Sequence, residues 1–342
     1  MKKKFLMTLA ALVLIVCLSA IVLAGCDDKE KDEAIEINVI VPDGSPAIAL
    51  AKMINDNDAP EGYKINYRIV EGATNIGTSI AQGSADVAIA PTNLLSTIYN
   101  NTGSGKLVGT IVQGALYMVG KTALPGDTTA EKLASLKGKV VYNIGQGATP
   151  DLTFKYILEH FDIEYANTAE PTADQIGLQY VNSGSELIPL LKQGKAQFGV
   201  LGEPAVSNAN SNAKTQTVLD IQELWKEVTG SQNAGFPQAG LYVVNKYLSG
   251  EHWPLIDWIK EKMVEAGSWA VGNPSLVSQI MVENGSASLN GLTAEKIAGC
   301  NISWISATDS KKSMNQYLGA LYLFDPKTIG GRLPDDGFYY VG

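Results

Sequence analysis

An internal repeat occupies the middle of the chain, and it restricts the possible folds more than any other feature of the sequence. Residues 67–91 match residues 178–202 when they are shifted by 111 positions without a gap. Both copies predict a strand, a turn, a helix, a Gln-Gly corner and a second strand. The repeat therefore predicts two similar α/β halves. The matched positions include Val70 with Val181, Gln82 with Gln193, Gly83 with Gly194 and Ala85 with Ala196.

A further strand and helix precede each copy. One strand leads to Gly44-Ser45-Pro46, and the other leads to Gly147-Ala148-Thr149-Pro150. We expect Ser45 and Thr149 to be N-caps and each proline to be the first helical residue, because proline lacks a donor and has a fixed φ. Each half then has the order β-α-β-α-β, with short apolar strands that are typical of a buried parallel sheet. The predicted strands cover 37–41 and 139–144, and the helices that follow cover 47–55 and 151–160.

The order of these segments predicts two lobes, with the chain crossing between them twice. We place the crossings at residues 118–124 and 234–239, and a capping box of Thr128 and Glu131 opens the helix after the first. The predicted lobes are 36–119 with 239–342, and 120–238. Helices at 253–269, 275–284, 293–298 and 309–323 should pack on the first lobe, with Trp253, Trp258 and Trp269 in the core.

The N-terminus has the features of an export signal. Three lysines at 2–4 precede an apolar run over 5–23, and the run ends in Leu23-Ala24-Gly25-Cys26. This ending resembles a bacterial lipoprotein signal, which implies removal of residues 1–25, lipidation of Cys26 and a charged tether over 26–35. A transmembrane anchor is the alternative, because the run approaches the ~20 residues that span a bilayer.

Charge and reactive side chains exclude several functions. Loss of the three signal lysines changes the formal net charge from −9 to −12, which argues against nucleic acid as a partner. Cys300 has no partner for a disulfide once Cys17 is removed and Cys26 is lipidated, and we expect it to be buried. We expect His160 and His252 to be surface or helix-cap residues, and the sequence contains no metal-ligand cluster, nucleophile elbow or phosphate loop. The sequence therefore predicts no catalytic residue, metal or cofactor.

Three short motifs carry a resemblance to a known family: Ser45-Pro46, the Gly-Ser-Ala-Asp-Val-Ala segment at 83–88, and Leu-Gly-Glu-Pro at 201–204. With the signal, the two lobes and the helical C-terminus, the chain resembles a substrate-binding lipoprotein of an ABC importer over about residues 36–270. Within that class it is similar to the nitrate, aliphatic-sulfonate and thiamine-precursor branch (NMT1/THI5-like). The resemblance implies an α/β periplasmic-binding-protein type II fold, with two doubly wound lobes joined by two crossing segments. It also implies a monomer, lipid-anchored on the extracytoplasmic face of the cell membrane, that works with ABC permease and ATPase subunits.

Candidate ligand contacts follow from the fold, because open α/β sheets bind ligands beyond the carboxyl ends of their strands. Helix N–H groups at the two proline turns would bind an anion or a carbonyl, Glu203 would accept from a donor, and Phe236 would stack. Neither arginine, Arg68 or Arg332, falls on these loops, which favours a neutral or cationic nitrogen-bearing solute such as a heterocycle or an amine. The full candidate set is Ser45, Pro46, Thr74, Asn75, Thr92, Asn93, Gln113, Thr149, Ser185, Glu203 and Phe236.

Several alternatives stay open. A sulfonate or nitrate could be held by helix termini alone, and Ser45, Thr149 and Glu203 could serve only structural roles. An anchored sensor would use the same lobes without transport. A pyrimidine-synthase-like enzyme is a further alternative, but it needs acid–base or metal groups that the sequence does not offer. Closure of the lobes by bending at the two crossings is the expected mechanism.

Overall fold

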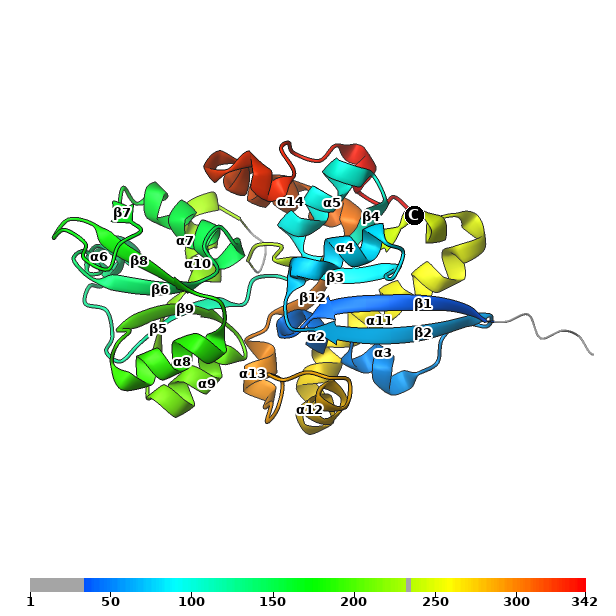
Figure 1. The fold of residues 1–342 in the computed structure, drawn as a ribbon, viewed down its shortest axis with the longest axis horizontal. Coiled ribbons are helices and arrows are strands. Elements are labelled where there is room, and N and C mark those ends of the chain that lie inside the picture. Colours follow the sequence, from blue (N-terminus) through cyan, green and yellow to red (C-terminus); the bar gives the residue numbers. More distant parts are fainter. Residues whose placement is uncertain (1–33, 232–234) are drawn as a thin grey trace, which may run out of the picture. The chain divides into compact units, whose positions relative to one another are not determined.

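The computed structural model describes residues 34–231 and 235–342, so the predicted signal, Cys26 and most of the tether lie outside the described residues. Glu36–Gly342 form one compact unit. This unit contains two six-stranded sheets, and helices cover both faces of each sheet (Figure 1). The predicted α/β class with two doubly wound halves is confirmed.

The first sheet is built from the N-terminal part of the chain and from strands that return to it later. Its order is β12-β4-β11-β3-β1-β2. β1 and β3 are parallel, whereas β11 is antiparallel to both β3 and β4, and β12 is antiparallel to β4. The strands are β1 (Ile35–Pro42), β2 (Tyr63–Val70), β3 (Val87–Pro91), β4 (Gly105–Val112), β11 (Ala239–Val244) and β12 (Ile302–Ser306).

Two groups of helices cover the first sheet (Figure 1). One face is packed by α3 (Ala51–Asp56), α11 (Trp253–Gly272) and α12 (Pro274–Glu283). The opposite face is packed by α4 (Ile76–Ala81), α5 (Thr92–Thr102) and α14 (Ala307–Phe324). The predicted C-terminal helices are thus present, but the sequence reading missed strand β12, which lies between α13 (Ala294–Ala298) and α14.

The second sheet has the order β10-β5-β9-β6-β8-β7. β6 is parallel to β8 and to β9, whereas β5 is antiparallel to β9 and to β10. Its strands are β5 (Leu116–Gly120), β6 (Val140–Ile144), β7 (Tyr165–Ala166), β8 (Ile176–Val181), β9 (Phe198–Gly202) and β10 (Gln216–Asp220). Its helices are α6 (Thr129–Ala134), α7 (Thr149–His160) and α10 (Ile221–Thr229) on one face, and α8 (Gly184–Gln193) and α9 (Ala205–Ala213) on the other (Figure 1).

The predicted repeat is present in both sheets. The neighbouring strands β3-β1-β2 correspond to β9-β6-β8, and β3 falls on β9 after the shift of 111 residues. In the first sheet β3 is also next to the antiparallel strand β11, and in the second sheet β9 is next to the antiparallel strand β5. The chain reaches each of these two strands directly after it has passed from one sheet to the other. The two halves therefore exchange one strand each.

The first passage between the sheets differs from the predicted crossing at 118–124. β4 ends at Val112 in the first sheet and β5 begins at Leu116 in the second, so the passage is only residues 113–115. Gly114 has φ of 86° in the middle of this passage, a conformation that glycine adopts without a steric cost. Met118 lies inside a strand because it pairs with Val200 of β9. The predicted lobe limits, 36–119 with 239–342 and 120–238, otherwise remain a prediction.

The two proline turns are capped differently from the prediction. The N-cap of α2 (Ser45–Ile48) is Gly44 and that of α7 is Ala148, so Ser45 and Thr149 are the first helical residues and the prolines are the second. Neither hydroxyl caps its helix, because both bond to residues far away in the chain, as described below. The capping box at α6 is confirmed: Thr128 Oγ1 accepts from Glu131 N at 3.3 Å, and Glu131 Oε2 accepts from Thr128 N at 3.0 Å.

Burial confirms that Cys300 is a packed side chain, and it corrects the prediction for Trp253. Cys300 is fully buried, and burial raises the pKa of its thiol to about 12. His252, predicted as a surface or cap residue, occupies the N-cap position of α11 and is buried, with Nδ1 at 2.8 Å from the Tyr63 hydroxyl. Trp253 was predicted in the core but is 58% exposed, at the first residue of α11. No helix in the described part of the chain is long and apolar enough to cross a membrane.

Candidate functional site

Residues that follow the carboxyl ends of strands in opposite sheets come into contact. Ser45 follows β1 of the first sheet, and Glu203 follows β9 of the second. The Ser45 hydroxyl donates to the backbone carbonyl of Glu203 at 2.8 Å. Ser45 is buried by this contact, so two of the predicted site residues meet directly.

A second pair joins the sheets in the same way. Asn93 lies in the first turn of α5, which follows β3, and Thr149 begins α7 just beyond β6. Thr149 Oγ1 donates to Asn93 Oδ1 at 3.3 Å. Asn93 also donates from Nδ2 to the carbonyl of Thr328, in the short helix η4 (Pro326–Ile329), at 3.3 Å. The ends of four strands thus contribute two polar contacts between the sheets.

Glu203 places a carboxyl group beside the Ser45 contact. Its Oε1 accepts from Ser207 Oγ at 2.9 Å, and its Oε2 accepts from Ser207 N at 3.2 Å. Burial raises the pKa of the Glu203 carboxyl, while these hydrogen bonds and the charge of Lys296 oppose that rise. The side chain packs against Gly299, where an added Cβ would lie 3.0 Å from Glu203 Cγ. An acidic group therefore lines the contact between the sheets and disfavours an anion there.

A third set of contacts extends this region, and the sequence reading did not find it. The Tyr117 hydroxyl of β5 donates to the carbonyl of Gly299 at 3.0 Å. Lys296 Nζ donates to Asn208 Oδ1 of α9 at 3.1 Å. Both contacts join the loop around α13 to the second sheet. Their partners lie 182 and 88 residues apart, and no local pattern in the sequence marks such distant pairs.

Three other predicted residues are buried and engaged by protein groups. Thr92 donates from Oγ1 to the carbonyl of Pro237 at 2.6 Å. Gln113 donates from Nε2 to Thr110 Oγ1 at 3.0 Å and to the carbonyl of Ser303 at 2.8 Å. Phe236 is fully buried and stacks on Tyr317, with ring centroids 5.1 Å apart. Their contacts join α5 to Pro237, the end of β4 to β12, and Phe236 to α14.

The remaining predicted residues lie away from the two polar pairs or at their margin. Pro46 is half-buried beside Ser45, and Asn75 is exposed at the start of α4. Ser185 is exposed in the first turn of α8, with its Oγ 2.7 Å from Ser183 Oγ. The side chain of Thr74 lies outside the described part. Direct solute contact stays a prediction for all eleven residues of the candidate set.

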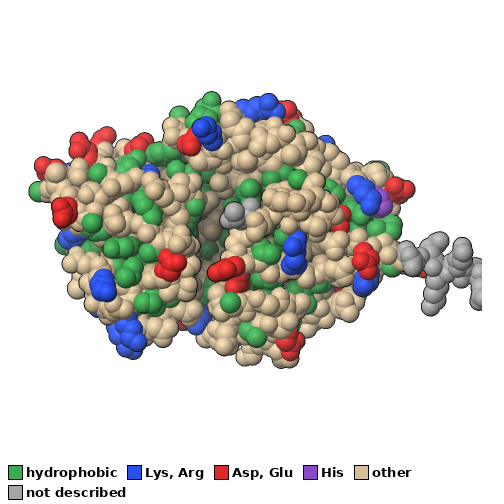
Figure 2. Space-filling model, viewed as in Figure 1, with side chains coloured by type: hydrophobic (Ala, Val, Ile, Leu, Met, Phe, Trp, Pro, Cys, Tyr) green, Lys and Arg blue, Asp and Glu red, His purple; other side chains and the backbone are tan. Residues whose placement is uncertain are grey.

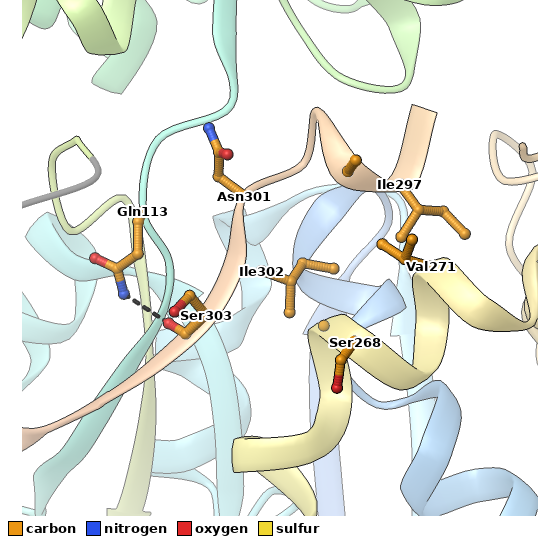
Figure 3. Close-up of a pocket in the computed structure, with 9 residues that line it drawn as sticks. Gln113, Ser268, Val271, Ile297, Asn301, Ile302 and Ser303 are labelled. Carbon is orange, nitrogen blue, oxygen red and sulfur yellow. Dashed lines mark hydrogen bonds between the residues drawn. The ribbon is translucent and has the colours of Figure 1, made fainter. Parts of the chain in front are cut away.

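A cavity of about 420 Å³ opens beside the first passage (Figure 3). Its volume lies in the range of small-molecule sites. Gln113 reaches it, and Asn301 next to it donates from Nδ2 to the carbonyl of Gly114 at 2.7 Å. None of the residues that line the cavity is charged; they are Gln113, Gly267, Ser268, Val271, Ile297, Ala298, Asn301, Ile302 and Ser303.

The described residues offer no group of three or more His, Cys, Asp or Glu side chains that could hold a metal ion. On the face shown in Figure 2, lysine and arginine side chains stand apart from one another and are interspersed with acidic ones. Strong nucleic-acid binding needs several basic contacts to phosphate, and this face does not gather them.

Solved structures of transport proteins share this architecture. An ABC transporter protein from Parabacteroides distasonis has a TM-score of 0.73 and 25% sequence identity, over 91% of this chain and 99% of that one. The aliphatic sulphonate binding protein SsuA from Escherichia coli has a TM-score of 0.61 and 15% identity, over 88% and 92%. The alkanesulfonate-binding protein SsuA from Xanthomonas axonopodis pv. citri, bound to MOPS, has a TM-score of 0.56 and 13% identity, over 89% and 96%.

No protein-family model matches the chain, and no curated protein matches it. The likeness to solved structures nevertheless identifies the fold as that of the periplasmic-binding-protein type II class. The architecture and the neighbours fit the solute-binding component of an ABC importer, as the sequence predicted, and they leave the solute unspecified.

Proposed function

We propose that this protein captures a small organic solute between its two sheets and delivers it to the membrane permease of an ABC importer. The observation that carries the proposal is the meeting of strand-end residues from opposite sheets, Ser45 with Glu203 and Asn93 with Thr149. A solute that enters between the opened sheets meets the same hydroxyl, amide and carboxyl groups. The sheets then close over it by bending at the two passages, residues 113–115 and the segment between α10 and β11.

The charges near these contacts favour a neutral or cationic nitrogen-bearing solute, such as a heterocycle or an amine. Glu203 contributes negative charge, and both arginines are engaged elsewhere. Arg68 Nη2 donates to Ser79 Oγ at 3.1 Å, and Arg332 Nη2 donates to the carbonyl of Asn100 at 3.4 Å. A sulfonate or nitrate is the second candidate, because the N-terminus of the twelve-residue helix α7 lies at the Thr149 contact and attracts anions.

Native mass spectrometry of the protein purified without refolding tests the proposal. We expect a small molecule that is released from the folded protein on activation. Thermal unfolding with 4-aminopyrimidine, methanesulfonate or nitrate then compares the solute classes, because a ligand that binds only the folded state raises Tm. We expect the heterocycle to raise Tm more than the two anions. Absence of both a released molecule and any rise in Tm would overturn the proposed function.

Transport and sensing are separated by uptake. A strain that lacks this protein should lose uptake of the released solute, and the purified protein should leave that solute chemically unchanged. Normal uptake by such a strain, with binding intact in the purified protein, would favour an anchored sensor. Turnover of the solute would favour an enzyme.

We also propose that Cys26 anchors the protein to the extracytoplasmic face of the cell membrane through acyl chains, as the Leu-Ala-Gly-Cys ending predicts. The mature chain would then begin at Cys26 and act as a monomer with permease and ATPase subunits. A C26S variant should leave the membrane fraction, because attachment depends on the acyl chains. An unchanged membrane fraction would instead support the alternative of a transmembrane anchor.

A further inference from the structure

Asn143 carries a buried donor that has no acceptor. The residue is fully buried near the end of β6, and its Oδ1 accepts from Ile144 N at 2.9 Å. Its Nδ2 lies within hydrogen-bond distance of no acceptor among the residues that the structure describes. Buried amide donors nearly always have a partner, so this one calls for an explanation.

The position of Asn143 places this donor where a ligand is expected. β6 lies between β8 and β9, and it is parallel to both. Ligands of open α/β sheets bind beyond the carboxyl ends of such strands. Two other buried polar atoms lack partners within the described ranges, Tyr67 Oη and Asn100 Oδ1, but Tyr67 lies on the outermost strand β2 and Asn100 lies late in α5.

The face on which Asn143 lies follows from the strand register. Asn143 pairs with Tyr180 of β8, and residues paired in a parallel register project from the same face of a sheet. The Tyr180 hydroxyl donates to Asp151 Oδ1, in the first turn of α7, at 3.0 Å. Asn143 therefore lies on the α7 side of the sheet, near the N-terminus of that helix.

The side chains of Asp151 and Thr149 at the start of α7 already have partners. Asp151 Oδ2 accepts from Gly147 N at 2.8 Å and from Lys155 Nζ at 2.9 Å. Thr149 donates to Asn93 of the first sheet at 3.3 Å. Among the described residues, Asn143 Nδ2 is thus a buried side-chain donor of this region without an acceptor, and it lies on the strand that leads to the Asn93–Thr149 contact.

We propose that Asn143 Nδ2 donates a hydrogen bond to the bound solute. The solute then presents an acceptor, such as a carbonyl oxygen or a ring nitrogen, toward the carboxyl end of β6. This inference rests on the proposed function, and it adds a specificity-determining residue that the sequence reading did not name. A buried donor without an acceptor lowers the stability of the empty protein. Removal of this donor should therefore weaken solute binding without lowering the free energy of unfolding.

Two substitutions at this position test the inference. N143L replaces the amide with an apolar group of similar size, and N143D keeps the acceptor for Ile144 N but removes the donor at neutral pH. The control is N284L, because Asn284 Nδ2 already donates to the carbonyl of Ile280 at 2.9 Å, at the end of α12. Affinities for 4-aminopyrimidine, methanesulfonate and nitrate are measured by calorimetry, and Tm is measured without ligand.

We expect N143L and N143D to weaken, by about 10-fold or more, the binding of whichever probe the wild type binds. N143L removes both the unsatisfied donor and the acceptor of Ile144 N, so the Tm of the empty variant should change little, whereas N284L should lose Tm and keep its affinity. Equal affinity in N143L, N143D and wild type would overturn the role of Asn143 and leave the proposed function standing. If the wild type binds no probe and releases no co-purified molecule, both the role of Asn143 and the proposed function are overturned.

Discussion

Glu203 is a residue for which a structural role and a role in solute binding must be separated. Its backbone carbonyl accepts from Ser45, which follows β1 of the first sheet, while its carboxylate accepts from Ser207 in the first turn of α9. The sequence could identify an acid in an otherwise uncharged stretch before Pro204, but it could not tell a solute contact from a structural hydrogen bond. The structure shows the structural bonds, and solute contact remains a prediction.

The variant E203Q separates these two roles. If the carboxylate accepts a hydrogen bond from the solute, E203Q should weaken binding by about 1–3 kcal/mol. The S207A variant is the control, because it removes the hydroxyl that holds the carboxylate and leaves the charge in place. Calorimetry with the released solute measures both affinities, and unchanged binding by E203Q would remove Glu203 from the site.

The same residue predicts a pH dependence of stability. Because burial raises the pKa of Glu203, the folded protein holds this proton more tightly than the unfolded chain does. The contribution of Glu203 to the free energy of unfolding should therefore fall as pH rises through its folded pKa. Urea titrations from pH 4 to 8 should show a smaller fall for E203Q than for wild type, and identical curves would contradict the shift.

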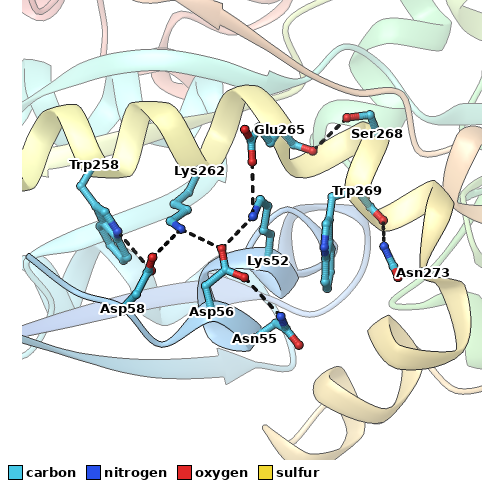
Figure 4. A network of polar contacts seen from close by, with 10 residues as sticks. All are labelled: Lys52, Asn55, Asp56, Asp58, Trp258, Lys262, Glu265, Ser268, Trp269 and Asn273. Carbon is cyan, nitrogen blue, oxygen red and sulfur yellow. Dashed lines mark hydrogen bonds and ion pairs between the residues drawn. The ribbon is translucent and has the colours of Figure 1, made fainter.

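At the scale of elements, a charged network joins the short helix α3 to α11 (Figure 4). Asp56 Oδ2 accepts from Lys52 Nζ and from Lys262 Nζ, both at 2.7 Å, and Lys262 also donates to Asp58 Oδ2 at 3.0 Å. Lys52 pairs with Glu265 Oε2 at 3.2 Å. Burial opposes ionisation of Asp56, but the hydrogen bonds from the two lysines outweigh it and lower its pKa to about 2.

The variant K262M should lower the free energy of unfolding at pH 7 by about 2 kcal/mol, because Asp56 and Asp58 each lose the ammonium group that they share. The control is K64M, which breaks the exposed pair with Glu36 and should leave the free energy of unfolding nearly unchanged, because solvent screens that pair. Urea unfolding measures both. Since the pKa of Asp56 is depressed, its stabilising contribution should be lost as pH falls from about 4 toward 2, and K262M should reduce that loss.

Helix α14 shows how one element can serve both sheets. The sequence predicted that it packs on the first lobe, and it does contact β4 and α5. It also contacts α7 of the second sheet, where Tyr317 Oη lies 3.2 Å from Thr153 Oγ1. The Tyr317 ring is fully buried between Trp225 and Phe236.

Two substitutions at Tyr317 measure this bridge. Y317F removes the buried hydroxyl and should cost about 1 kcal/mol of unfolding free energy, whereas Y317A leaves a cavity and should cost about 3–5 kcal/mol. Y322F is the control on the same helix, because Tyr322 is exposed and its change should be near zero. Equal urea midpoints for Y317A and wild type would contradict the bridging role.

At the scale of the whole molecule, a single apolar core connects the described parts of the two sheets. It includes Ile40 and Ala88 of the first sheet and Val141 and Val200 of the second, together with Tyr317 and Phe236. Closure over a solute would therefore bring together the polar groups at the strand ends while this core stays packed. Small-angle scattering should show a decrease in radius of gyration when the released solute saturates the protein, and an unchanged radius would reject closure.

The sequence by itself determined the features that depend on local pattern. Hydrophobic periodicity and the shifted repeat predicted the strands and helices of both halves, and the Thr128 capping box was predicted from residues three positions apart. The apolar setting of Cys300 predicted its burial. These features follow from residues close together in the chain, whose preferences act before any tertiary contact forms.

Only the tertiary structure decided which groups meet. Ser45 and Thr149 were assigned as caps because local rules favour that role, yet their partners lie 158 and 56 residues away. The first passage lies at residues 113–115 and not at 118–124, because Leu116–Gly120 pair with β9 as strand β5. His252 contacts Tyr63, which lies 189 residues away in the chain, and this contact contributes to its burial. Such pairings depend on how the sheets fold onto one another, and a pattern read over a few neighbouring residues contains no information about them.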